Sequence, residues 1–159
     1  MNFWVGITHF NWYTFHAAQK LVEEVNFWSP SGRTFKAISW GYPFLFKLKS
    51  KPYIAGGGFF TKSLPLNVAW ETFGKANGAG TYLEFQQLIE ATRADKNLSD
   101  DEIGCTVLVE PFFFEESDWI PFRLASGNQR GKRFDTSDLE GKALWDKVQV
   151  RLAKSHRKI

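Results

Sequence analysis

The chain has 159 residues and a formal net charge of +3, and a length of this order suits a single domain. With 43% hydrophobic and 23% charged residues, it is neither a disordered nor a collagen-like sequence. The single cysteine, Cys105, excludes an internal disulfide framework and a cysteine-based zinc cluster. No apolar run approaches the roughly 20 residues of a membrane span and no signal-peptide pattern opens the chain, so we expect a soluble cytoplasmic protein without a membrane partner.

The charge is divided into three blocks along the chain. Residues 1–62 sum to +5, residues 63–122 to −8 and residues 123–159 to +6. Such segregation can steer a polyanion to one side of a protein, although it also arises by chance in many proteins.

The first third of the chain predicts strands around one helix. Residues 2–8 are aromatic and partly alternating, as in a strand, and Asn11 can cap a helix over residues 12–24. A short strand over residues 25–28 follows. Residues 44–49 alternate with period two, and with residues 53–60 they predict an antiparallel hairpin. The glycines at 56–58 in its second strand indicate the close approach of a neighbouring helix or of a ligand.

The acidic middle predicts helices. Pro65 is suited to a first helical position, and Thr81 with Glu84 forms a capping box for a helix through about residue 92. We therefore expect a helical acidic insert over about residues 63–102.

The last third predicts strands and a final helix. Residues 104–109 form a β-branched strand that Pro111 ends, and residues 119–124 are extended. The composition of residues 126–135 predicts a basic loop. A capping box at Ser137 opens a helix, and its apolar stripe consists of Leu144, Trp145, Val148 and Leu152. Residues 154–159 form a basic tail behind a domain of residues 1–153.

This order of elements predicts an α+β fold. We expect a small twisted β-barrel of about five to six strands, closed by late strands that pair with early ones and decorated by three to four helices.

Catalytic and metal-binding patterns are not found in the sequence. The histidines at 9, 16 and 156 lack the spacing of a metal site, and no P-loop or Gly-x-Ser-x-Gly motif occurs. Cys105 lies in an apolar strand that disfavours its thiolate. We expect a binding protein with no catalytic residue, cofactor or metal.

Aromatic and basic residues are concentrated together. Of the 27 aromatic residues, 16 lie in residues 1–62, the block with a charge of +5. Aromatic rings stack on nucleic-acid bases while lysine and arginine hold phosphates, although many of these rings also suit a core. Trp28 is the best stacking candidate, because it ends a strand directly before the turn Ser29-Pro30-Ser31-Gly32.

Several segments together resemble an EVE-type domain of the PUA-like superfamily. They are residues 2–5, 27–32, 41–47 and 54–60, with a departure at Tyr42-Pro43 where the family pattern has Gly-Asp. Residues 65–74 and 103–121 resemble more specifically the N-terminal PUA-like domain of bacterial HNH endonucleases of the modification-dependent restriction type.

The resemblance implies a PUA-like barrel that reads DNA by flipping a modified base into an aromatic pocket. The expected ligand is double-stranded DNA with a modified cytosine, in the 5-methyl or 5-hydroxymethyl form, and the expected setting is a bacterial cytoplasmic protein with a fused HNH nuclease domain. The pocket residues carried over are Trp28, Phe27, Ser29, Ser31, Asn11 and Trp12. Asn11 is equally suited to a plain helix cap, and Trp12 to a wall of the core.

Basic residues near these segments are the candidate phosphate ligands. We expect Arg33, Lys36, Lys47, Lys49, Arg130, Lys132 and Arg133 to flank the pocket. The lysines are also suited to solubilising an exposed strand. Two alternative functions stay open, namely an RNA-binding PUA-like module and a barrel that binds a small planar molecule.

Overall fold

The computed structural model describes residues 1–19, 22–29, 37–65, 80, 81, 83, 84, 87, 104–125 and 130–157. Its strands are β1 (Asn2–Thr8), β2 (Glu24–Ser29), β3 (Pro43–Leu48), β4 (Tyr53–Pro65), β5 (Gly104–Phe113), β6 (Ile120–Pro121) and β7 (Gly131–Asp135). Its helices are α1 (Phe10–Ala17), the short 3₁₀ helix η3 (Glu116–Asp118) and α4 (Leu139–Arg157). In the described part of the chain, no helix is long and apolar enough to cross a membrane.

The seven strands form one mixed sheet in the order β2-β5-β4-β3-β1-β7, with β6 paired to the start of β4. The pair β1–β3 is parallel and the other pairs are antiparallel. The predicted pairing of a late strand with an early one is therefore confirmed by β7 and β1. The predicted barrel is not shown, because β2 and β7 are the edges of the sheet among the described strands.

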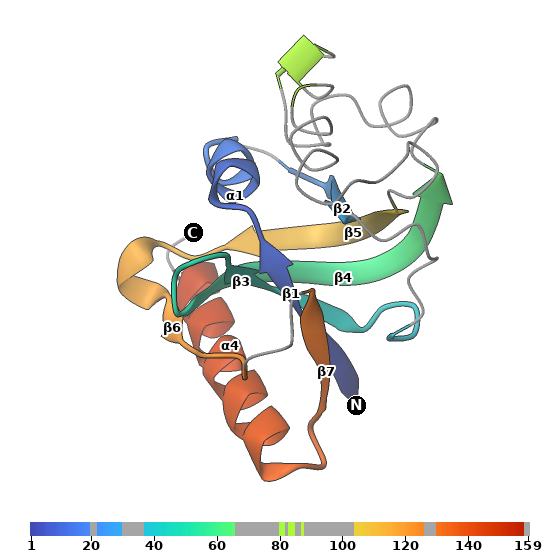
Figure 1. The fold of residues 1–159 in the computed structure, drawn as a ribbon. Coiled ribbons are helices and arrows are strands. Elements are labelled where there is room, and N and C mark those ends of the chain that lie inside the picture. The colour runs from blue at the N-terminus through green and yellow to red at the C-terminus, as the bar shows by residue number, and fades with distance from the viewer. Residues whose placement is uncertain are drawn as a thin grey trace.

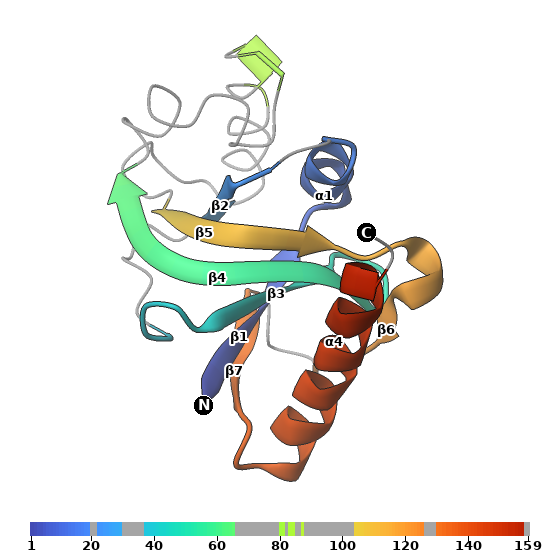
Figure 2. The same ribbon diagram turned by 180° about the vertical axis from the view of Figure 1, so that it is seen from behind.

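The two α-helices cover opposite sides of the sheet (Figures 1 and 2). Trp12 and Tyr13 of α1 pack on one side, in a core cluster with Phe44, Phe46 and Leu48. Leu144 and Val148 of α4 pack on the other side, in a cluster with Phe3, Val5, Leu45, Ile54 and Ile120. Because both faces of β3 are covered, five of its six residues are buried.

The predicted helix over residues 12–24 is wrong in its bounds, since α1 ends at Ala17 and residues 24–29 form β2. Only α1 and α4 are α-helices with bounds among the described residues, fewer than the three to four predicted. The middle insert lies mostly outside the described residues. Within it, the backbone N–H of Glu84 donates to Thr81 Oγ1 at 3.2 Å, as the predicted cap requires.

Both proline assignments need correction. Pro65 is the last residue of β4 and not the first of a helix. Pro111 does not end β5, which continues to Phe113. A shift in the β4–β5 register lies beside it, and Glu110 there has a φ of 48°. Proline is tolerated in a strand at such a bulge because no ladder hydrogen bond is needed from its nitrogen.

The segment predicted as a basic loop contains β7. Phe3 pairs with Phe134 in the β1–β7 register, and their rings stack with centroids 5.7 Å apart. After β7, the chain enters α4, whose predicted stripe is confirmed because Leu144, Trp145, Val148 and Leu152 all lie in the α4-side cluster. The helix also includes residues 154–157 of the predicted tail, where Lys154 contacts Asp118 at 2.7 Å.

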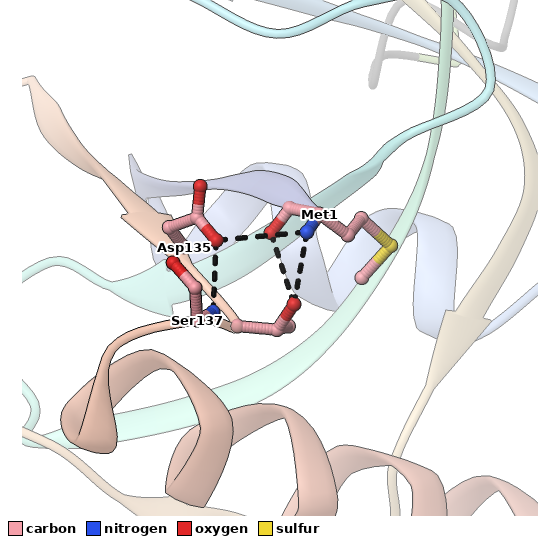
Figure 3. A network of polar contacts seen from close by, with 4 residues as sticks. Met1, Asp135 and Ser137 are labelled. Carbon is pink, nitrogen blue, oxygen red and sulfur yellow. Dashed lines mark hydrogen bonds and ion pairs between the residues drawn. The ribbon is translucent and has the colours of Figure 1, made fainter.

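The start of the chain is fastened to the β7–α4 junction (Figure 3). The Met1 ammonium donates to Thr136 Oγ1 at 2.9 Å and lies 3.5 Å from Asp135 Oδ1. Asp135 Oδ1 also accepts a hydrogen bond from the Ser137 N–H at 2.8 Å, and this bond is the main reason that the Asp135 pKa is lowered. These contacts align β7 beside β1.

The glycines of β4 lie where neighbouring strands leave no room for a side chain. A Cβ on Gly56 would collide with the Phe112 carbonyl oxygen, and one on Gly57 would lie 2.7 Å from the Phe44 carbonyl oxygen. At Gly58 the nearest atom is the Leu108 Cβ at 3.0 Å. The close approach predicted from the sequence is therefore made by β3 and β5, and neither a helix nor a ligand is needed to explain it.

We predict that Gly56→Ala lowers the free energy of unfolding by about 2–4 kcal/mol, because the colliding atom belongs to the backbone of a paired strand. Gly58→Ala is the matched control and should cost less, since its nearest neighbour, the Leu108 Cβ at 3.0 Å, needs to move by only a few tenths of an ångström. Urea unfolding followed by circular dichroism measures both. Equal losses in the two variants would contradict the proposed backbone collision.

Candidate nucleic-acid interface

Two predicted pocket residues, Phe27 and Trp12, are buried in the α1-side cluster. The Phe27 ring packs edge-on against Trp12 with centroids 5.3 Å apart and stacks with Phe46 at 6.2 Å. The Trp12 indole N–H donates to the Asn26 carbonyl oxygen at 3.2 Å. These contacts support the core role for Trp12 that the sequence left open. The two rings hold α1 against β2.

Asn11 does not cap α1. The helix begins at Phe10 with His9 in the capping position, and no side-chain cap bond is formed there. Asn11 lies inside the first turn with an exposed side chain, and its carbonyl oxygen accepts a hydrogen bond from Thr14 Oγ1 at 3.1 Å. Its side chain is therefore free of the capping role that the sequence suggested.

The remaining pocket residues are described only in part. Trp28 and Ser29 are the last residues of β2, and their backbones pair with Cys105 and Gly104 of β5. Ser31, Arg33 and Lys36 lie outside the described residues.

His16, one of the three histidines without metal-site spacing, is a buried titratable group on α1. Its ring lies 4.4 Å from the Trp12 ring and stacks with Phe113 at 6.3 Å. Burial lowers its pKa to about 4. Within the described residues, its Nε2 atom has no hydrogen-bond partner. An imidazole in this environment is neutral near pH 7.

Basic residues gather at the end of the sheet where β1 and β3 finish. We call this surface the basic end, and it consists of Lys47, Lys49, Lys51, Arg123 and Arg130. Lys49 and Arg130 are tied to β1, since the Lys49 N–H donates to the Thr8 carbonyl at 2.8 Å and the Ile7 N–H donates to the Arg130 carbonyl at 3.0 Å.

The other members of the basic end belong to the turn after β3 and to the segment after β6. The Lys51 ammonium lies 4.7 Å from the centre of the Phe10 ring. The Phe122 N–H donates to the Pro52 carbonyl at 2.9 Å, which places Arg123 beside the same turn. In the described part of the chain, none of the five cations forms an ion pair with a carboxylate.

The predicted phosphate ligands on β7 do not share one face of the sheet. Lys132 pairs with Val5, a residue of the α4-side cluster, and its ammonium lies 5.2 Å from the Phe134 ring centre. Arg133 pairs with Trp4, which packs on the α1-side cluster. Because successive strand residues point to opposite faces, these two cations serve different surfaces.

The basic end is also distant from the end of β2. Trp28 pairs with Cys105, which pairs with Leu64 late in β4, whereas Lys47 pairs with Ile54 at the beginning of β4. Ten strand positions correspond to roughly 30 Å of path along β4, which curves strongly in Figure 1. Lys47 therefore lies at the opposite end of β4 from the strand residue Trp28.

Lys51 and Arg123 were not among the predicted phosphate ligands. Both flank short connections, so no periodic pattern marks them. Their shared location depends on the pairing of β6 with β4, which joins residues 53 and 121. Trp40 was also not among the predicted site residues, although it is 75% exposed. Among the described residues, no group of three or more His, Cys, Asp or Glu could hold a metal ion.

Comparison with family models and with curated proteins finds no match to this chain.

We predict that His16 makes the stability of the fold sensitive to acid. Its pKa is about 4 in the folded state and 6.5 as an ordinary histidine, so the unfolded chain takes up a proton first. The stabilisation is complete above pH 6.5 and is lost as the pH falls towards 4. Between pH 8 and pH 5 the free energy of unfolding should therefore fall by about 2 kcal/mol.

Urea unfolding at both pH values tests the His16 prediction. His16→Phe should remove this part of the pH dependence, whereas His9→Gln, at an exposed histidine, should keep it. The same pH dependence in His16→Phe and the original protein would show that another group is responsible.

Proposed function

We propose that this domain binds nucleic acid, and that its ligand is double-stranded DNA with a modified base. The observation that carries the proposal is the basic end, where five cations gather without a carboxylate partner in the described part of the chain. Unpaired Lys and Arg side chains on one surface are the usual ligands of a phosphate backbone, since they replace its condensed counterions.

Exposed aromatic side chains support a nucleic-acid ligand over a simple anion. Phe10 lies under Lys51 at the basic end, and Tyr53 follows the same turn. They are 38% and 36% exposed. Rings at the border of a cationic surface can stack on unpaired bases, which contributes about 1–3 kcal/mol per base.

The modified-base specificity rests on the resemblance to EVE-type PUA-like domains. We propose a PUA-like barrel for the complete domain, and the curved sheet, with its late strand β7 beside β1, supports this. A modified cytosine is the proposed base, received by the segment after β2 that begins at Trp28. In this proposal, the domain provides the specificity of a modification-dependent HNH endonuclease.

We predict that DNA binding depends on the cations of the basic end. Lys49→Gln and Lys51→Gln should each lower the affinity for modified and unmodified duplexes equally. Each should also lower the slope of log affinity against log salt by about one. Lys142→Gln is the matched control, because Lys142 on α4 already pairs with Asp146 at 3.1 Å. Fluorescence anisotropy over a salt series measures these values.

The same assay separates the possible ligands. Binding that is unaffected by salt would contradict a nucleic-acid function and favour a small planar ligand. Tighter binding of an RNA hairpin than of either duplex would show that the ligand is RNA and not DNA.

We further predict that Trp28→Ala removes the preference for the modified duplex. The loss of a stacking face should lower affinity for modified DNA about tenfold and leave unmodified DNA unchanged. The ratio of the two affinities is the measurement, and it is insensitive to a general loss of folded protein. An unchanged ratio would show that Trp28 does not contact the base.

A further inference from the structure

Lys47 differs from the other lysines of the basic end in its position on the sheet. It pairs with Ile7 of β1 on one side and with Ile54 of β4 on the other. Its neighbours Phe46 and Leu48 belong to the α1-side cluster, so Lys47 emerges on the α4 side, beside Ile54. The side chain is only half exposed, and its ammonium donates to the Leu48 carbonyl oxygen at 3.0 Å.

A second cation, Arg123, lies on the segment that β6 and the Phe122–Pro52 hydrogen bond hold beside the start of β4, the strand that pairs with Lys47. The pKa of Lys47 is lowered first by burial and then by the charge of Arg123. Each effect makes the charged ammonium less favourable than it would be in water. Arg123 is exposed and follows β6, which is held to the start of β4 by the pairs 53–121 and 54–120.

The residues that pair with Lys47 in the sheet carry no charge. Lys47 pairs with the isoleucines Ile7 and Ile54, and the Ile7 N–H donates to the carbonyl oxygen of a further basic residue, Arg130. Neither Lys47 nor Arg123 has a carboxylate partner among the described residues. Two adjacent like charges, one of them partly dehydrated, are stabilised by an anion placed between them.

We propose that Lys47 and Arg123 form a discrete phosphate-binding site. The Lys47 ammonium has two donors left after its bond to Leu48, and the Arg123 guanidinium offers a planar fork for two phosphate oxygens. The site accepts one phosphate group, and in the proposed function that group belongs to the DNA backbone. This site deepens the proposed function, and it also makes a claim that free phosphate can test.

The first test uses inorganic phosphate as the probe and backbone amide NMR as the readout. Phosphate should shift the amides of Leu48, Phe122 and Arg123 in a saturable way. The shifts should disappear in Lys47→Gln and in Arg123→Gln, and should persist in Lys142→Gln. Arg123 is exposed, so its variant reports on the site even if Lys47→Gln unfolds.

The second test uses an unmodified duplex with the same variants. Lys47→Gln and Arg123→Gln should each weaken binding about 3- to 10-fold in low salt and lower the salt slope by about one. Lys47→Arg keeps the charge and should bind within about twofold of the original protein.

The outcomes distinguish the site from the proposed function. The site is overturned if phosphate does not change the amide chemical shifts, or if the changes persist in both glutamine variants. If DNA binds but neither glutamine variant alters its affinity, the site is again overturned while the proposed function stands. If phosphate binds as expected and no nucleic acid binds, the site stands and the proposed function fails.

Discussion

The bend of β4 is the constraint on which the rest of the fold depends. This strand pairs with β3, β5 and β6, and its successive residues Ile54 and Ala55 point to opposite faces, into the α4-side and the α1-side cluster respectively. Gly56 and Gly57 let the backbone carbonyls of the neighbouring strands approach to distances at which a Cβ would collide. Register shifts on both sides of β4 absorb the remaining curvature. One long strand can therefore organise two cores.

The covered sheet also determines where a ligand can bind. Because α1 and α4 occupy opposite faces, the strands' side chains are used mainly for packing, as β3 shows with Phe44, Phe46 and Leu48 buried on the α1 side and Leu45 on the α4 side. Polar groups can reach solvent chiefly where strands end and turns begin. The five cations of the basic end are placed in this way, with four of them in turns or connections and only Lys47 inside a strand. Binding at the rim of a rigid sheet costs little reorganisation.

Local patterns in the sequence were sufficient for much of the fold. Period-two alternation located the β3–β4 hairpin, and the spacing of Leu144, Val148 and Leu152 located α4. Long-range contacts could not be predicted in this way. Only Phe134 is apolar and buried in β7, and its partner Phe3 lies more than a hundred residues earlier. The position of Arg123 relative to Lys47 likewise depends on β6, a strand of two residues with no pattern of its own.

The position of β1 has a consequence for how the chain folds. Its two hydrogen-bonded neighbours are β3 and β7, so one edge stays open until residue 135 has left the ribosome. A native contact of this sequence separation raises the contact order and slows folding, because a long loop must close before the pairing is stabilised. An open, aromatic strand edge is also a site for association between nascent chains. Chaperones that shield such edges would therefore raise the yield of this protein more than they would for a helical domain of the same length.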